Sequence, residues 1–221
     1  MSASEQAADG HSLSQELQQV VAGLNGQDTT LGALVDAIGD RGFGLLLMIL
    51  ALPAALPLPA PGYATPFGIL MIGLSWQLLR GRDQPWFPER TRASKVSFKL
   101  LDFSVRNGRL PLRAVELLVR PRLSRLAGSK TFLAAVALVI MVMAAFMSLP
   151  IPLTNTAPSF VIFVLAAGIL EEDGLLLVGG LILAPVAAAI AALALYTAAT
   201  LGPEAVEETV KPMVKGWLGL G

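Results

Sequence analysis

The sequence predicts an all-α, polytopic membrane protein with two similar halves, each a pair of apolar helices interrupted by a Leu-Pro-x-Pro break. Apolar residues make up 54% of the 221 residues and charged residues only 14%, where soluble domains carry about a quarter charged residues. The mean hydropathy is +0.67. The shortage of charge is local, because no Asp, Glu, Lys or Arg occurs in three tracts: Phe43–Leu79, Thr131–Leu170 and Gly174–Pro203.

The lengths of these tracts favour membrane spans. A spanning helix needs roughly 20 apolar residues. Phe43–Leu79 has 37 residues and Thr131–Leu170 has 40, so each is long enough for a helical hairpin. Gly174–Pro203 has 30 residues, enough for one further helix. The alternative is a large buried helical core in a soluble protein.

The basic residues are concentrated in one part of the chain. Thirteen of the 16 Lys and Arg residues lie between Arg80 and Lys130, where four acids leave a net charge of +9. Basic loops stay on the cytoplasmic side of a membrane, so we expect this connection and the N-terminus inside the cell. Apolar tracts on both sides favour contact with the bilayer and its anionic lipid headgroups over nucleic-acid binding.

The division of the chain follows from these tracts. Residues 1–11 are predicted to be a disordered tail, and 12–93 a first repeat with amphipathic helices and the membrane tract 43–79. Residues 94–130 form a basic amphipathic connection, 131–203 the second membrane tract with a final helix, and 204–221 a C-terminal tail. The N-terminal segment lacks the basic-then-apolar pattern of a cleaved signal peptide.

Within the first repeat, Thr30 is expected to cap a short helix.

The break between the two helices of each half is rich in proline. Leu56-Pro57-Leu58-Pro59 corresponds to Leu149-Pro150-Ile151-Pro152, and Arg80 then aligns with Glu172. Such a break is either a tight external turn or a re-entrant segment at membrane depth, which is tolerated only against protein or water. The helix-breaking prolines are Pro57, Pro59, Pro61, Pro66, Pro150, Pro152 and Pro158.

Polar residues inside the apolar tracts are the candidates for a solute site, because burying them in lipid is costly without partners. They either coordinate an ion or polar solute, or cap helix starts. Catalytic and metal-binding residues are not expected, since the chain has no cysteine and His11 is its only histidine. No cofactor is expected either. The candidate residues are Thr65, Gln77, Thr154, Asn155 and Thr156.

Charged residues mark the borders of the apolar tracts. Arg80 and Arg82 end the first tract, and Glu171, Glu172 and Asp173 end the second. The acids either form a carboxylate site or a solvated border, and they are placed to face the two arginines of the other half. Trp86 follows as an interfacial anchor at headgroup depth.

The ordered motifs resemble those of the bacterial ExoD family, named for exopolysaccharide synthesis. The resemblance rests on Gly39-Asp40-Arg41-Gly42-Phe43-Gly44, Leu52-Pro53-Ala54-Ala55-Leu56-Pro57, Pro61-Gly62, Gln77 with Gly81, Pro85-Trp86-Phe87-Pro88, Leu149-Pro150-Ile151-Pro152 and Asn155. It covers about Leu13–Leu201, and Trp86-Phe87-Pro88 departs slightly from the expected Trp-Leu-Pro. The resemblance implies an inner-membrane protein linked to exopolysaccharide production and supplies no catalytic residue.

Two functions are therefore expected. In the first, the chain is a small permease or channel that acts as a homodimer, because one chain offers few helices to enclose a pathway. In the second, it is a non-transporting accessory subunit that organises exopolysaccharide machinery. An enzyme ranks third.

Overall fold

The computed structural model describes residues 28–30, 32, 33, 36, 41–55, 64–96, 123–149, 151, 154–202, 204–206, 208 and 212. They belong to two compact units. The larger comprises Gly39–Trp86 and Pro121–Gly221, and the smaller comprises Met1–Ile38 and Phe87–Arg120. The predicted N-terminal tail, most of the basic connection and most of the C-terminal tail lie outside the described residues.

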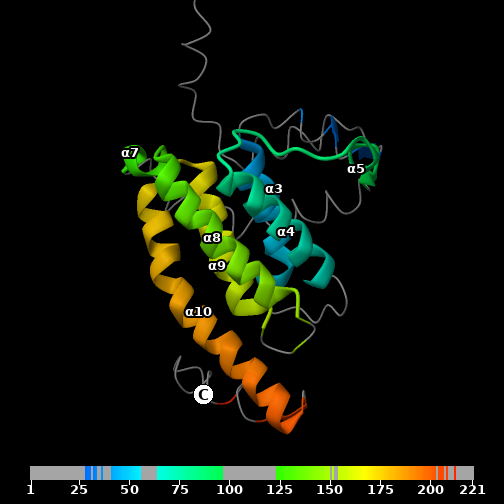
Figure 1. Cartoon of the computed structure of the whole chain (residues 1–221), viewed down its shortest axis with the longest axis vertical. Coiled ribbons are helices and arrows are strands. Elements are labelled where there is room, and N and C mark those ends of the chain that lie inside the picture. The colour runs from blue at the N-terminus through cyan, green and yellow to red at the C-terminus, as the bar shows by residue number, and fades with distance from the viewer. Residues whose placement is uncertain are drawn as a thin grey trace, which may run out of the picture. The chain divides into compact units, whose positions relative to one another are not determined.

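The larger unit is built from long apolar helices (Figure 1). They are α3 (Gly42–Ala55), α4 (Ala64–Leu79), α8 (Lys130–Met147), α9 (Thr156–Leu170) and α10 (Gly174–Leu201), with the single turn α7 (Ser124–Ala127) before α8. The predominantly helical fold is as predicted. The sequence also predicts that Pro53 interrupts the apolar helix Phe43–Leu56, because proline lacks the N–H of a helix interior. That detail is wrong, since α3 continues through Pro53.

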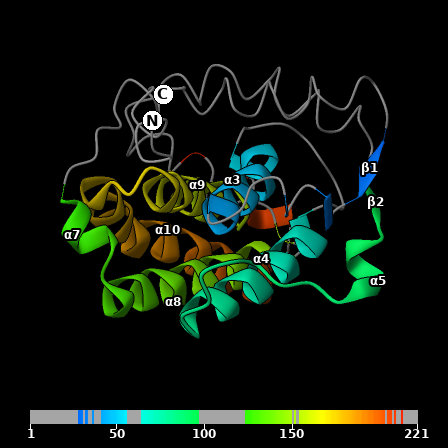
Figure 2. The same cartoon turned by 90° about the horizontal axis from the view of Figure 1, so that it is seen from above.

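Each helix of the first predicted half packs mainly against a helix of the second half. Helix α3 packs chiefly along α9, and α4 chiefly along α8, while α10 packs along α9 (Figure 2). Glycines allow two of these close approaches. A Cβ at Gly44 would lie 2.8 Å from the backbone N of Leu170, and one at Gly68 would meet Ser148 Oγ and the Ala144 carbonyl.

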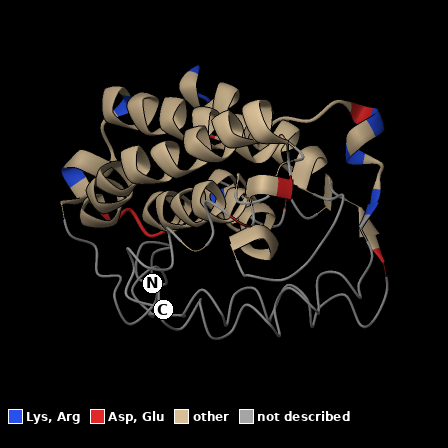
Figure 3. Ribbon diagram, turned by 90° about the horizontal axis from the view of Figure 1, so that it is seen from below, with Lys and Arg blue, Asp and Glu red and all other residues tan. Residues whose placement is uncertain are grey.

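Two helices, α8 and α10, are long and apolar enough to cross a membrane. Only 33% and 28% of their most apolar windows are buried inside the protein, whereas the core helix of a soluble protein is mostly buried. Large apolar side chains face outward instead, among them Ile182 and Leu201, each 68% exposed. Figure 3 shows the long helices free of charge along their lengths, with charged residues at their ends. These features indicate membrane association.

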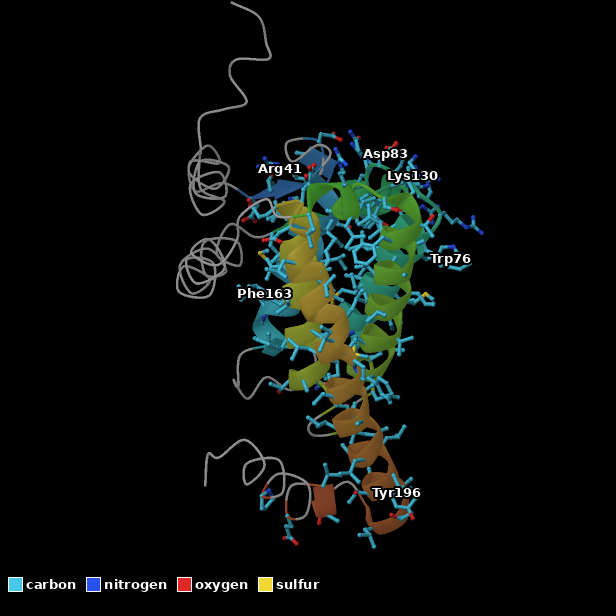
Figure 4. All side chains as sticks on the ribbon, turned by 90° about the vertical axis from the view of Figure 1, so that its left-hand side faces the viewer. Arg41, Trp76, Asp83, Lys130, Phe163 and Tyr196 are labelled. Carbon is cyan, nitrogen blue, oxygen red and sulfur yellow. The ribbon has the colours of Figure 1, made fainter. Side chains whose placement is uncertain are left out.

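The charged ends of the helices gather at one end of the larger unit. Figure 4 shows Arg41, Asp83 and Lys130 there, and Tyr196 at the opposite end. Arg41 precedes α3, Lys130 begins α8, and Asp83 follows α4. Helices α3 and α8 therefore both start at this end, and α4 returns to it.

The smaller unit holds a two-residue strand pair that the sequence did not predict. Strand β1 (Thr29–Thr30) pairs antiparallel with β2 (Lys95–Val96), which follows the single turn α5 (Glu89–Arg92). Arg92 Nη2 donates to Asp36 Oδ2 at 2.6 Å, and this bond and the Asp36 charge raise the pKa of Arg92. The Ala33 N–H donates to Thr30 Oγ1 at 3.2 Å, as a helix cap requires.

Candidate functional site

The first predicted polar residue, Thr65, links the start of α4 to the end of α8. It lies in the first turn of α4, and its hydroxyl donates to the Ser148 carbonyl at 3.0 Å, just beyond the end of α8. The Ser148 hydroxyl donates back to Ala144 O at 2.8 Å. Because a helix end leaves its last carbonyls without intrahelical partners, Thr65 satisfies one of those left by α8. The start of α4 is thereby fixed to the end of α8.

Thr154 is fully buried, and its hydroxyl donates to the Ile151 carbonyl at 2.7 Å. Asn155 occupies the N-cap position of α9 without a side-chain capping bond. Its carbonyl instead accepts the Ser159 hydroxyl at 2.6 Å. The buried hydroxyls at this break thus donate to backbone carbonyls, rather than accept the N–H groups that a cap would bind. Thr156 is exposed at the start of α9.

Two of the predicted helix-breaking prolines are described. Pro66 and Pro158 each occupy the third position of their helices, α4 and α9. Proline is tolerated in a first turn, because its missing N–H would have no intrahelical partner there. Pro66 is exposed and Pro158 is buried. The others, Pro57, Pro59, Pro61, Pro150 and Pro152, lie outside the described residues.

The two arginines at the border of the first tract lie over tryptophan rings. The Arg80 guanidinium carbon is 4.7 Å from the centre of the Trp76 ring, one helical turn earlier. The Arg82 guanidinium carbon is 5.7 Å from the centre of the Trp86 ring. All four side chains are exposed. We call Trp76, Arg80, Arg82 and Trp86 the Trp–Arg cluster.

Gln77 holds the loop between the two tryptophans. Its side-chain Oε1 accepts the Trp86 N–H at 2.7 Å, and its carbonyl accepts the Arg82 N–H at 3.3 Å. Pro85 is buried, and a Cβ at Gly42 would lie 2.8 Å from its Cδ. The polar group that was predicted as part of a solute site is therefore bound within this loop.

The three acidic residues after α9 differ in burial and in their contacts. Asp173 is 1% exposed and caps α10, accepting the N–H groups of Leu175 at 2.8 Å and Leu176 at 3.3 Å. Glu172 is exposed and adopts a left-handed backbone with φ of 50°. Glu171 is half-buried. Among the described residues, no ion pair joins these acids to Arg80 or Arg82.

Helices α4 and α9 end in the same hydrogen-bonding motif. The N–H of Gly81 donates to Leu78 O at 2.9 Å, and the N–H of Arg82 to Gln77 O. After α9, the N–H of Glu172 donates to Ile169 O at 3.4 Å, and that of Asp173 to Gly168 O at 2.9 Å. This is the Schellman motif, in which glycine is the favoured left-handed residue. In the motif after α4 the left-handed residue is Gly81, with φ of 73°. In the motif after α9 the same position is occupied by Glu172, which is not a glycine.

We therefore expect Glu172→Gly to raise the free energy of unfolding by about 0.5 kcal/mol, because relief of the left-handed strain outweighs the added chain entropy. Gly81→Ala should lower it by about 1 kcal/mol. Nothing lies within 4 Å of a Cβ at Gly81, so that loss would be conformational. Thermal unfolding in detergent measures both. A destabilised Glu172→Gly variant would mean that the glutamate side chain contributes more than its backbone costs.

Sequence reasoning missed Ser148 and the stacking partner Trp76. Ser148 gives no signal in the sequence, because its role depends on α4 lying against α8. Trp76 precedes Arg80 by four residues, a helical spacing that places them on one face, so the pair was detectable. Among the described residues, no group of three or more His, Cys, Asp or Glu side chains is placed to hold a metal ion.

These features define a helical protein with two helices long and apolar enough to cross a membrane, whose polar side chains bind helix ends and whose charges flank apolar segments. The family described as "Exopolysaccharide synthesis, ExoD" matches residues 13–193, and the chain belongs to the ExoD family, which confirms the predicted family. Protein ExoD of Rhizobium meliloti is 34% identical over 172 residues, covering 76% of this chain and 71% of that protein.

An uncharacterized protein of Synechocystis sp. is 37% identical over 171 residues, covering 77% of this chain and 81% of the relative. No solved structure matches the chain. The family links the chain to exopolysaccharide synthesis.

Proposed function

We propose that the chain is a multi-pass inner-membrane protein that supports exopolysaccharide production as a small permease, in which two similar halves build one pathway. The observation that carries the proposal is the crosswise packing of α3 on α9 and α4 on α8. If α3 corresponds to α8 and α4 to α9, exchanging the halves turns each of these contacts into the other. Transporters often place their sites between such repeats.

The helix ends support the same correspondence. Helices α4 and α9 both carry proline at their third position and both end in a Schellman motif. The left-handed residues pair Gly81 with Glu172, one residue away from the Arg80–Glu172 alignment of the sequence. Because α3 and α8 start at the same end (Figure 4), the halves would be related by rotation about an axis along the helices.

The charge distribution supports an orientation. The end that carries Arg41, Arg80, Arg82 and Lys130 is proposed to face the cytoplasm, with the N-terminus and the basic connection. The end of α8 and the starts of α4 and α9 then face the other side. A homodimer would supply the additional helices that a pathway needs, since one chain offers only five long ones in the part that the structure describes.

The second candidate function is a non-transporting accessory subunit of a polysaccharide synthesis or export complex. It is favoured by the hydrogen bonds of Thr65 and Thr154, whose hydroxyls are already bound to backbone carbonyls. A hydroxyl that serves the protein's own backbone is less available to a passing solute. Residues at the charged end would then meet the partner enzymes.

Cysteine labelling separates the two functions, because the native chain has no cysteine. Single cysteines at Thr65, Asn155 and Thr156 are treated in intact cells with a membrane-impermeant maleimide. A permease predicts water access at all three, including the half-buried Thr65 and Asn155. Labelling of the exposed Thr156 alone, with the other two protected, would favour the accessory subunit. A cysteine at the outward-facing Ile182 controls for lipid exposure and should remain unlabelled.

The link to exopolysaccharide is tested in a Rhizobium meliloti strain that lacks Protein ExoD. Expression of this chain should restore exopolysaccharide, measured as secreted carbohydrate. If the chain is present in the inner membrane and secretion stays at the level of the deletion strain, the proposed function is wrong.

A further inference from the structure

The Trp–Arg cluster has the composition of a headgroup site at the edge of a bilayer. Tryptophan side chains prefer the membrane–water interface, and Trp76 and Trp86 are 45% and 55% exposed. Figure 4 shows Trp76 on the outside of the helices, toward the end with Asp83 and Lys130. Arginine binds phosphate through several N–H groups at once. The cluster therefore combines an interfacial anchor with phosphate donors.

The two arginines keep donors available for such a ligand. A guanidinium above a ring uses its face for the cation–π contact and leaves its N–H groups at its edge. In the part of the chain that the structure describes, neither Arg80 nor Arg82 has a carboxylate within ion-pair distance. Asp83 is the neighbouring acid in sequence and is exposed, so it reduces but does not cancel the local positive charge.

The loop also has the rigidity that a specific site needs. Gln77 binds both the Arg82 N–H and the Trp86 N–H, and Pro85 is buried against the start of α3. The left-handed Gly81 turns the chain between the two arginines. A preorganised pair of donors loses less entropy on binding than two free side chains.

We propose that the Trp–Arg cluster binds the phosphate of an anionic phospholipid in the cytoplasmic leaflet, with Arg80 and Arg82 as donors and Trp76 and Trp86 as interfacial supports. The inference rests on the proposed membrane orientation. The sequence predicts contact between anionic lipids and the whole basic connection, and the proposal assigns this contact to four side chains. Gln77 acts as a positioning residue, because it holds Arg82 and Trp86 in place.

The test titrates the full chain in neutral detergent with phosphatidylglycerol and follows tryptophan fluorescence. The background carries Trp217→Phe, so that emission comes from Trp76 and Trp86. We expect saturable binding of phosphatidylglycerol and none of phosphatidylcholine. Arg80→Gln with Arg82→Gln should weaken binding about thirtyfold, because each basic residue at a membrane surface contributes roughly 1 kcal/mol.

The matched control is Arg90→Gln with Lys95→Gln, which removes the same charge from exposed positions of the smaller unit. It should bind like the parent chain. Equal losses in the two double variants would overturn the site, since they would reflect net charge alone. Unchanged binding in the Arg80/Arg82 variant, or equal response to phosphatidylcholine, would also overturn it. So would competition by inorganic phosphate at matched ionic strength, which would indicate a free-anion site.

If the glutamine pair fails to fold, Arg80→Lys with Arg82→Lys replaces it, because lysine keeps the charge and loses the planar fork. That variant should bind phosphatidylglycerol several-fold more weakly, and parent-like binding would contradict the proposal. The readout is independent of exopolysaccharide. If the chain restores secretion but binds phosphatidylglycerol no better than phosphatidylcholine, only the lipid site is wrong. If it binds phosphatidylglycerol selectively but does not restore secretion, only the proposed function is wrong.

Discussion

Replacing Gly44 with alanine is expected to lower the free energy of unfolding by about 2 kcal/mol, the typical cost of overpacking a well-packed interior. The new Cβ would lie 2.8 Å from the backbone N of Leu170 and 2.9 Å from its Cα. Because these are backbone atoms, no rotamer change relieves the contact, and α3 must move away from α9. The thermal unfolding temperature in detergent micelles measures the loss.

Gly73→Ala is the matched control for this substitution. Gly73 also lies within a helix, α4, but nothing lies within 4 Å of a Cβ there. Alanine is a better helix former than glycine, so this variant should be unchanged or more stable by up to about 1 kcal/mol. Similar losses at Gly44 and Gly73 would show that the α3–α9 approach is not as close as described.

Asp173→Ala is expected to cost about 2 kcal/mol, at the upper end for a helix cap because the site is buried. The carboxylate is 1% exposed and accepts two N–H groups, those of Leu175 and Leu176. Alanine leaves both donors without their acceptor in a place that water reaches poorly. Thermal unfolding measures the effect, and α10 should be the part most weakened.

Asp173→Asn separates the cap from the charge. The asparagine side-chain oxygen can accept the same N–H groups, and asparagine is as good an N-cap residue as aspartate. We expect it to retain more than half of the stability lost in Asp173→Ala. An asparagine variant as unstable as the alanine variant would mean that the negative charge of Asp173, and not its capping bonds, stabilises the start of α10.

The long helices could be predicted from the sequence because each is apolar, strongly helix-forming and bounded by proline, glycine or charge. The tract Gly174–Pro203 was predicted to hold one helix, and the observed α10 begins at the same residue and ends at Leu201. The strand pair β1–β2 could not be predicted, since two-residue strands have no periodicity to detect. Pro53 was wrongly predicted to interrupt α3. A proline is tolerated inside such a helix when neighbouring groups satisfy the backbone carbonyl that it leaves without a donor.

The candidate site was predicted less well than the fold. Residue type alone does not tell whether a buried threonine serves a solute or a helix end, and the choice depends on which carbonyl lies nearby. For Thr65 that carbonyl belongs to Ser148, far away in the sequence. Gln77 and Arg80 were recognised as residues of interest at a helix end. The Trp76–Arg80 contact was detectable from its four-residue spacing, but the contact of Arg82 with Trp86 required three-dimensional placement.

Each helix of the first hairpin finds its main neighbour in the second: α3 against α9, and α4 against α8. In the proposed multi-pass arrangement, the first pair would enter the membrane during synthesis before its partners exist, and its small residues would face lipid until the second pair arrives. A chain truncated before Lys130 should insert but remain a loose, protease-sensitive pair of helices, since few of its native contacts are available to it. We therefore expect the first pair to reach its native packing only after the second pair has been made.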